Sequence, residues 1–81
     1  MDDGQKQPIT YFVNGEPEEV MVDELKVRQI LELADLKPVD KYKLKSLEPY
    51  KHDYGDNYDE TVKLHEAQRF EARHNGPTQA S

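Results

Sequence analysis

The sequence predicts an α+β fold in which one helix packs on a mixed sheet of four or five strands. Only the segment 27–35 has the apolar spacing of a helix face, with apolar residues at positions 27, 30, 31 and 34. Several other segments alternate apolar and polar residues, as strands with one covered face do. Since one helix has a single apolar stripe, one sheet is enough to cover it.

The beginning of the chain predicts a β-hairpin. Residues 9–13 are rich in β-branched and aromatic side chains, and their odd-numbered members share one face. The Asn14-Gly15 pair follows, and both residues tolerate the positive φ of a type I′ turn. Residues 19–22 alternate again, so we expect Val20 and Val22 to face the core.

The predicted helix has start and stop signals on both sides. Asp23 is a candidate N-cap, and Asp23 and Glu24 place negative charge at the positive end of the helix dipole. Leu25 is expected to cover the core just before the helix begins. The helix is expected to stop by Pro38, because a proline restricts the residue before it and cannot continue the hydrogen-bond ladder.

A strand and a long loop are predicted after the helix. In residues 40–47, Tyr42 and Leu44 alternate with lysines, which indicates a strand with one buried face and one solvated face. Such lysines also protect an edge strand against pairing with other chains. Residues 48–60 are crowded with Tyr, Asp and turn-forming residues, and we expect a loop there.

Two more strands complete the predicted sheet. Residues 61–64 and 69–73 alternate, with their even-numbered apolar residues facing inward, and a turn at 65–68 separates them. The resulting order is strand, strand, helix, strand, short strand, strand. This order is that of the β-grasp fold, in which the helix crosses a mixed sheet, and a right-handed crossover is expected where the second and third strands run parallel.

Composition limits the size and the class of the protein. The 81 residues suit one small domain, which we expect at 9–73, with a flexible arm at 1–8 and a flexible tail at 74–81. The chain has no cysteine, which excludes disulfides, thiolate catalysis and zinc-thiolate sites. A net charge of −6 argues against binding to duplex nucleic acid. No apolar run approaches the ~20 residues of a membrane span and no leader is recognisable, so we expect a cytosolic protein that does not bind a membrane.

Five short motifs in order resemble those of one family. The motifs are Phe-Val-Asn-Gly at 12–15, Gln-Ile-Leu-Glu-Leu-Ala at 29–34, Tyr-x-Leu at 42–44, Asp-Glu-Thr-Val-x-Leu at 59–64, and Phe70 in the closing strand. Together they resemble the bacterial multiubiquitin family of ubiquitin-like proteins. These proteins occur beside bacterial ubiquitin-activating, ubiquitin-conjugating and metallopeptidase-like enzymes. The resemblance covers roughly residues 9–75, and the chain carries one copy of the unit.

The resemblance implies a ubiquitin-like protein modifier with no active site and no bound cofactor. Such a modifier contributes its own C-terminal carboxylate. An activating enzyme adenylates it with ATP, and a conjugating enzyme then helps to transfer it to protein targets. The expected partners are therefore these two enzymes, a processing peptidase and the targets. The tail must be thin and extended, and six residues beyond Arg73 would reach up to roughly 20 Å.

The tail departs from the usual family pattern because it does not end in Gly-Gly. Its one glycine is Gly76, and we expect a peptidase to cut before it, which leaves Asn75 as the new C-terminus. Cleavage after Gly76 is less favoured because Pro77 makes that bond a hindered imide. An uncut tail that reacts at Ser81 is the alternative. Judged from its composition alone, the tail also suits a frayed terminus.

An exposed aromatic residue is the main surface candidate. Since Tyr11 and Val13 are expected to point inward, Phe12 should point outward, near Met21. An exposed aromatic beside a methionine suits contact with a partner enzyme, although single exposed apolar residues are common. Arg73 and His74, where the tail begins, complete this candidate enzyme-binding surface, which consists of Phe12, Met21, Arg73 and His74.

The polar clusters do not predict a metal site or a catalytic site. The acidic loop is Asp53, Asp56, Asn57, Asp59 and Glu60, but an EF-hand starting at Asp53 would need other residues at positions 55, 58 and 64. The histidines at 52, 65 and 74 lack ligand spacing, and we expect His52 to pair with Asp53. The tyrosines at 50, 54 and 58 are expected to hold the long loop against the sheet edge.

Two other functions suit the predicted fold. The first is an interaction module that binds partners through its sheet face and is never conjugated. The second is a carrier of sulfur for small molecules, against which the lack of a terminal Gly-Gly argues.

Overall fold

A computed structural model describes residues 7–74 and has the predicted α+β architecture. One helix packs on a five-stranded mixed sheet, and a second sheet has two strands. The elements in chain order are β1 (Ile9–Val13), β2 (Glu16–Val20), β3 (Glu24–Lys26), α1 (Val27–Leu33), the 3-10 helix η1 (Val39–Lys41), β4 (Tyr42–Ser46), β5 (His52–Gly55), β6 (Thr61–Lys63) and β7 (Arg69–His74).

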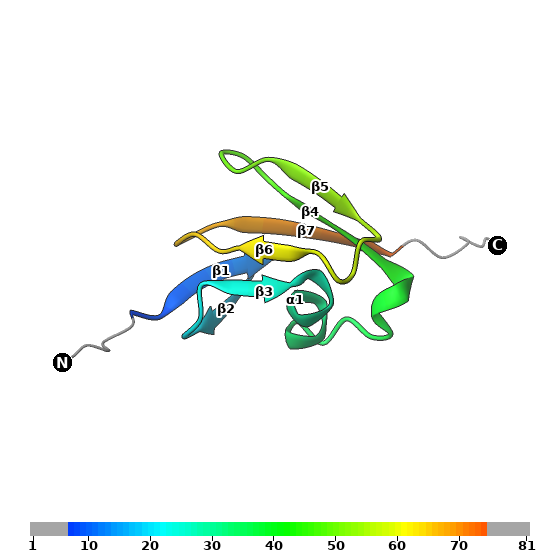
Figure 1. Ribbon diagram of the computed structural model, residues 1–81, viewed down its shortest axis with the longest axis horizontal. Coiled ribbons are helices and arrows are strands. Elements are labelled where there is room, and N and C mark those ends of the chain that lie inside the picture. The colour runs from blue at the N-terminus through cyan, green and yellow to red at the C-terminus, as the bar shows by residue number, and fades with distance from the viewer. Residues whose placement is uncertain (1–6, 75–81) are drawn as a thin grey trace.

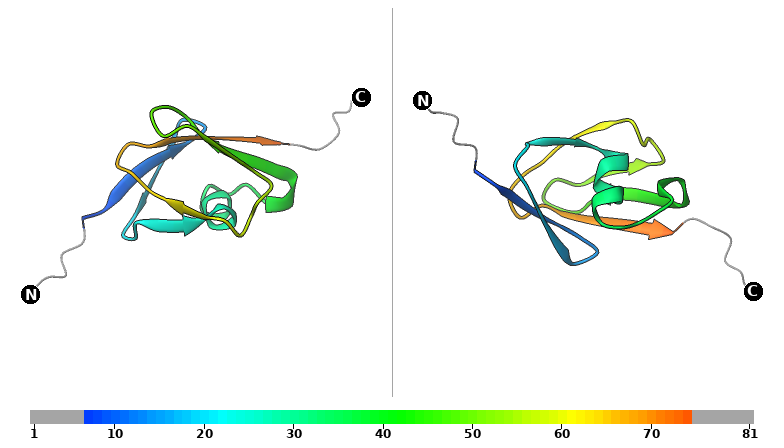
Figure 2. Two further views of the ribbon diagram at one scale, coloured as in Figure 1. Left: turned by 45° about the horizontal axis from the view of Figure 1, so that its top comes forward. Right: turned by 90° about the horizontal axis from the view of Figure 1, so that it is seen from below.

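The strand order β2-β1-β7-β4-β5 makes the fold β-grasp-like. β1 pairs with β7 in parallel, and the other three pairings of this sheet are antiparallel. β3 and β6 form the two-stranded sheet. α1, β3 and β6 lie on the same side of the large sheet (Figures 1 and 2). No helix or strand of residues 7–74 covers the opposite side of the large sheet, which we call the outer face.

The core lies between the large sheet and this covering layer. Its members come from β1, β3, α1, β4, β6 and β7 and from Leu64 directly after β6, whereas β2 only packs Val20 against the core. The two largest aromatic side chains, Tyr11 and Phe70, meet edge to face with ring centroids 5.6 Å apart. The buried apolar residues are Tyr11, Val13, Leu25, Val27, Ile30, Leu31, Leu44, Val62, Leu64, Phe70 and Ala72.

The predicted hairpin is confirmed, but its second strand begins earlier than expected. Asn14 and Gly15 have φ values of 53° and 84°, as a two-residue type I′ turn requires. This turn pairs Val13 with Glu16, so β2 starts directly after Gly15. β2 ends at Val20, which pairs with Ile9, the first residue of β1. The prediction that Val22 faces the core is therefore wrong, since Val22 lies beyond β2 and is exposed.

The helix begins at Val27, and the N-cap position belongs to Lys26, so the prediction of Asp23 as N-cap is wrong. Residues 24–26 form β3 instead, and this strand pairs with β6 and buries Leu25 as predicted. The side chain of Gln29 accepts a hydrogen bond of 2.8 Å from the backbone N–H of Lys26, which satisfies one free donor at the helix start.

The helix ends before Pro38 is reached, at Leu33. Asp35 adopts a left-handed conformation with φ of 62°, and its N–H donates to the carbonyl of Glu32. The N–H of Leu36 donates to the carbonyl of Leu31 at 2.9 Å, which completes the hydrogen-bond pattern of a Schellman motif. A local C-cap motif therefore ends the helix. Pro38, which the sequence predicts as the end of the helix, lies three residues beyond Asp35.

The segment 48–60, which the sequence predicts to be a loop, contains the edge strand β5. β5 pairs with β4, and the register shifts between Leu44 and Lys45. The sequence His-Asp-Tyr-Gly has no apolar alternation, so this strand leaves no periodic signal. Tyr54 and Tyr58, which were expected to hold a loop against the sheet edge, pack against the core, and Tyr54 itself belongs to β5. The Tyr58 hydroxyl donates to the Tyr42 carbonyl at 2.8 Å.

Candidate functional site

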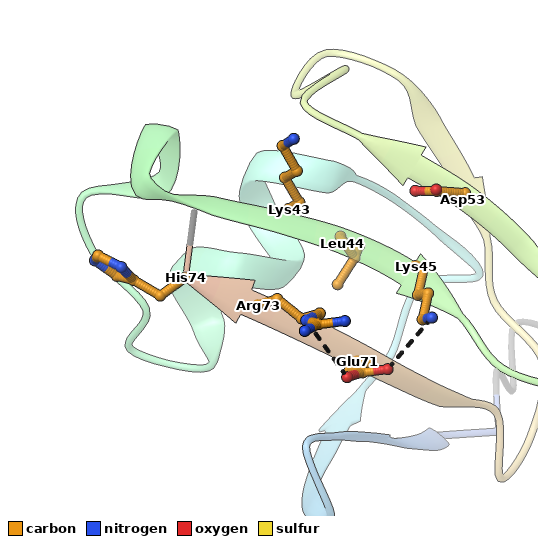
Figure 3. A pocket seen from close by; sticks show the side chains of 7 residues that line it. All are labelled: Lys43, Leu44, Lys45, Asp53, Glu71, Arg73 and His74. Carbon is orange, nitrogen blue, oxygen red and sulfur yellow. Dashed lines mark ion pairs between the residues drawn. The ribbon is translucent and has the colours of Figure 1, made fainter. Parts of the chain in front are cut away.

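The outer face carries charged side chains along β4 and β7 (Figure 3). Lys43 lies opposite Arg73, and Lys45 lies opposite Glu71. Glu71 is shared between two cations, since its Oε1 lies 3.6 Å from Lys45 Nζ and its Oε2 lies 4.0 Å from Arg73 Nε. Within residues 7–74, Lys43 forms no ion pair. These side chains border a shallow depression of about 320 Å³.

A second hollow on the same face is mainly apolar. Phe12 and Leu47 are partly buried, yet they do not belong to the core cluster or pack against it. They line a hollow of about 380 Å³, which we call the apolar groove. Glu71 borders both hollows and so connects them. The residues of the apolar groove are Phe12, Asn14, Gly15, Leu47, Arg69, Phe70 and Glu71.

The charge around the two hollows is opposite in sign to that of the whole chain. Arg69, at the apolar groove, donates to the carbonyl of Glu48 at 3.4 Å and forms no ion pair with any residue in 7–74. Although the chain has a net charge of −6, the two hollows are bordered by more cations than carboxylates. The cations are Lys43, Lys45, Arg69 and Arg73, and the carboxylates are Asp53 and Glu71.

The structure brings three of the four predicted surface residues to the outer face or its end, and separates the fourth. Phe12 lines the apolar groove, and Arg73 and His74 border the charged depression. Met21 does not lie near Phe12. The hairpin register pairs Phe12 with Pro17, so Met21 belongs to the other end of the hairpin, where it is 56% exposed.

The two predicted processing residues, Asn75 and Gly76, lie outside the described residues. The last described residue is His74, whose ring contacts that of Tyr42 edge to face with centroids 5.1 Å apart. β7 therefore remains packed against β4 up to the residue that precedes the predicted cleavage region.

Asp53 and Asp59 of the acidic loop form separate contacts with different partners. Arg28 donates from Nε and Nη2 to Asp59 Oδ1, at 3.1 and 2.7 Å. Asp53 Oδ1 accepts a hydrogen bond from the backbone N–H of Gly55 at 3.0 Å, as an Asx turn does. Among the described residues, no group of three or more His, Asp or Glu side chains could hold a metal ion.

The histidines lie apart, each beside a tyrosine. His52 Nε2 lies 3.7 Å from a Glu60 carboxylate oxygen, so the predicted partner, Asp53, is wrong. His65 stacks on Tyr50, with centroids 3.9 Å apart and ring planes nearly parallel. Tyr50 thus packs on the turn before β7 and remains exposed, while His74 packs on β4.

Sequence reasoning missed a buried polar pair behind the outer face. Gln68 and Ser46 are almost fully buried, and Gln68 Nε2 donates to Ser46 Oγ at 2.8 Å. The Gln68 Oε1 accepts from the backbone N–H of His65 at 2.9 Å. The pair joins β4 to the turn before β7. The one signal in the sequence is that Ser46 and Gln68 occupy positions where the alternation calls for an apolar residue. Exposed serines and glutamines give the same signal, so it does not identify a buried pair.

Two tyrosines have shifted pKa values. Burial raises the pKa of Tyr11 to about 12, with a smaller contribution from the negative charge of Glu18. The Tyr11 hydroxyl is buried and forms no hydrogen bond within the described structure. Burial and the charge of Glu60 also raise the pKa of Tyr54.

Comparisons of the chain with known protein families, with curated proteins and with solved structures found no match. None of the helices in residues 7–74 has the length and apolar character needed to cross a bilayer. The fold, the outer face and the motifs of the sequence are therefore the features that bear on the function of this chain.

Proposed function

We propose that this chain is a ubiquitin-like protein modifier. A peptidase trims its C-terminal segment, a cognate activating enzyme adenylates the new end, and a conjugating enzyme passes it to protein targets. The strand order β2-β1-β7-β4-β5 with one helix on a single face supports the proposal, because a ubiquitin-like body needs this topology. The resemblance of residues 9–75 to the bacterial multiubiquitin family is the second support.

The observation that carries the proposal is the position of β7 within the sheet. β7 is a central strand that pairs with β1 on one side and with β4 on the other, and it ends at His74. The Asn14 side chain adds two bonds to it, accepting from the Ala72 N–H at 2.9 Å and donating to the Ala72 carbonyl at 3.1 Å. A segment attached to this strand is joined to an element that is hydrogen-bonded to β1 at its start and to β4 up to His74.

In the proposed chemistry the chain is the substrate of its partner enzymes. The peptidase hydrolyses the bond between Asn75 and Gly76 and leaves the Asn75 carboxylate at the new end. This carboxylate attacks the α-phosphate of ATP on the activating enzyme, and pyrophosphate leaves. A nucleophile of an enzyme then takes the acyl group and releases AMP, and the final transfer moves the acyl group to a nucleophile of the target.

Mass spectrometry of the intact chain tests both steps. Incubation with a cognate processing peptidase should remove residues 76–81, and addition of the activating enzyme with ATP should then produce a covalent enzyme adduct. The double variant Asn75→Ala, Gly76→Ala should give no adduct, whereas the control Thr78→Ala should react normally because residue 78 lies beyond the proposed cut. A chain that stays uncut and forms no adduct with active enzymes would overturn the proposal.

The apolar groove favours a second function, a β-grasp interaction module that is never conjugated. The groove places Phe12 and Leu47 on an uncovered sheet face, where a partner has access to them. In that case the chain forms no covalent adduct, while Phe12→Ser removes binding to a non-covalent partner. The two functions are therefore separated by whether the complex survives denaturation.

A further inference from the structure

The apolar groove has the chemistry of a site for an acidic, apolar segment. Its walls include Phe12 and Leu47, and the Arg69 guanidinium beside them has no carboxylate partner among residues 7–74. An apolar side chain that fills the groove would lose contact with water, and a carboxylate next to it would face Arg69.

The chain itself exposes such a segment between β2 and β3. Met21 is 56% exposed and Val22 is 44% exposed, which makes them two of the most exposed large apolar side chains in the described structure. Exposed carboxylates flank them on both sides, at Glu19, Asp23 and Glu24. We call residues 19–24 the acidic turn.

One copy of the chain cannot place its acidic turn in its own groove. The groove includes Asn14 and Gly15, at the hairpin end where Val13 pairs with Glu16. The acidic turn begins at the other end, where β2 finishes at Val20 opposite Ile9. Five residues of paired strand separate the two surfaces, so only a second molecule can bring them together.

We propose that this chain self-associates head to tail, with the acidic turn of one copy seated in the apolar groove of the next. Met21 and Val22 contact Phe12 and Leu47, and carboxylates of the turn face Arg69. Because the two surfaces differ, the contact is heterologous, and a dimer keeps one free groove on one copy and one free turn on the other. This proposal does not depend on conjugation.

Sedimentation equilibrium of the full chain over a range of concentrations, at about 0.15 M salt to screen the repulsion between acidic copies, tests the contact. The weight-average mass should rise from 9.5 kDa with concentration. Arg69→Glu should weaken association at least tenfold by placing like charges together, and Met21→Ser should weaken it by removing the apolar anchor. Lys51→Glu changes the net charge equally at an exposed site outside the groove, and should associate as the wild type does.

Mixing the two weakened variants provides the decisive result. The Arg69→Glu chain keeps a normal acidic turn and the Met21→Ser chain keeps a normal groove, so the mixture should form 1:1 dimers that neither variant forms alone. Asp23→Lys should restore association to Arg69→Glu through the reversed charge pair. A mass that stays at 9.5 kDa at millimolar concentration overturns the proposal. The proposal is also overturned if the groove and turn variants leave self-association unchanged, or if the mixture stays monomeric. It is likewise overturned if the groove binds only a different protein.

Discussion

The two faces of β7 differ in burial although they belong to the same six residues. Phe70 and Ala72 point to the helix side and are buried in the core. Arg69, Glu71 and Arg73 point to the outer face, where they are at least partly exposed and border the two hollows. Alternation along one strand therefore separates residues that hold the body together from residues that a partner can reach.

The inner side chains of β7 are fixed by the needs of folding, whereas the outer side chains are not. A buried side chain that is truncated leaves a cavity, whereas an outer-face side chain that is replaced exchanges one solvated group for another. The fold requires apolar residues on the inner side of β7, but it does not require cations on the outer side. The excess of cations around the two hollows of an acidic chain is thus a property that folding alone does not explain.

The largest expected effect comes from Phe70→Ala. Phe70 is 1% exposed and packs against Tyr11, so its loss should lower the free energy of unfolding by about 3–5 kcal/mol. Urea denaturation followed by circular dichroism measures this change. Phe12→Ala on the outer face is the matched control and should cost less than about 1.5 kcal/mol. Equal losses for the two phenylalanines would contradict the distinction between the faces.

A smaller effect is expected for the buried polar pair. Gln68→Ala leaves Ser46 Oγ and the N–H of His65 without their partner, and should cost about 1–3 kcal/mol. Ser46→Ala removes only one of these bonds and should cost less. A double-mutant cycle measured by denaturation should give a coupling energy of at least about 0.5 kcal/mol, and additive effects would show that the pair is not coupled.

The buried phenol of Tyr11 gives a pH dependence. Its pKa is raised to about 12, so between pH 10 and pH 12 the unfolded chain loses the proton while the folded chain keeps it. The free energy of unfolding should therefore fall as the pH rises through this window. Thermal denaturation of Tyr11→Phe should show a smaller decrease in stability between pH 10 and pH 12 than the wild type shows. At neutral pH the variant should be as stable as the wild type or slightly more stable, because the buried Tyr11 hydroxyl has no hydrogen-bond partner within the described structure.

The smallest effect is expected on the outer face itself. Glu71→Gln removes the shared carboxylate of Lys45 and Arg73, but both pairs are solvated and long, so stability should change by less than about 0.5 kcal/mol. Denaturation at low and high salt measures the change, which salt should reduce further. A loss above 1.5 kcal/mol would mean that the outer face contributes to folding as the inner face does.

Periodicity predicted the elements whose one face is buried. The helix stripe, the Asn14-Gly15 hairpin and the inward residues of β7 are all visible because burial imposes a period of 3.6 or 2 on the sequence. The fold class follows from the order of these elements. β5 was missed because an edge strand with mainly exposed residues carries no such period.

The sites were harder to predict than the fold, since they depend on pairs of residues far apart in the chain. Phe12 was correctly expected on the outer side, but Leu47, its neighbour in the groove, belongs to a segment 35 positions later. The proposed neighbour, Met21, was wrong because the two-residue turn sets a register that carries Met21 away from Phe12. The Gln68–Ser46 pair likewise exists only once β4 and the β7 turn are brought together.

The parallel pairing of β1 and β7 also has a mechanical consequence. The start of β1 and the end of β7 lie at opposite ends of one strand pair, so tension between them shears that pair lengthwise. In this geometry the bonds between the strands, including the two from Asn14 to Ala72, share the load together instead of opening one by one. A domain loaded in this way resists forced unfolding by an enzyme that pulls on the chain. The unfolding rate constant of the domain then sets how fast such an enzyme can unfold it.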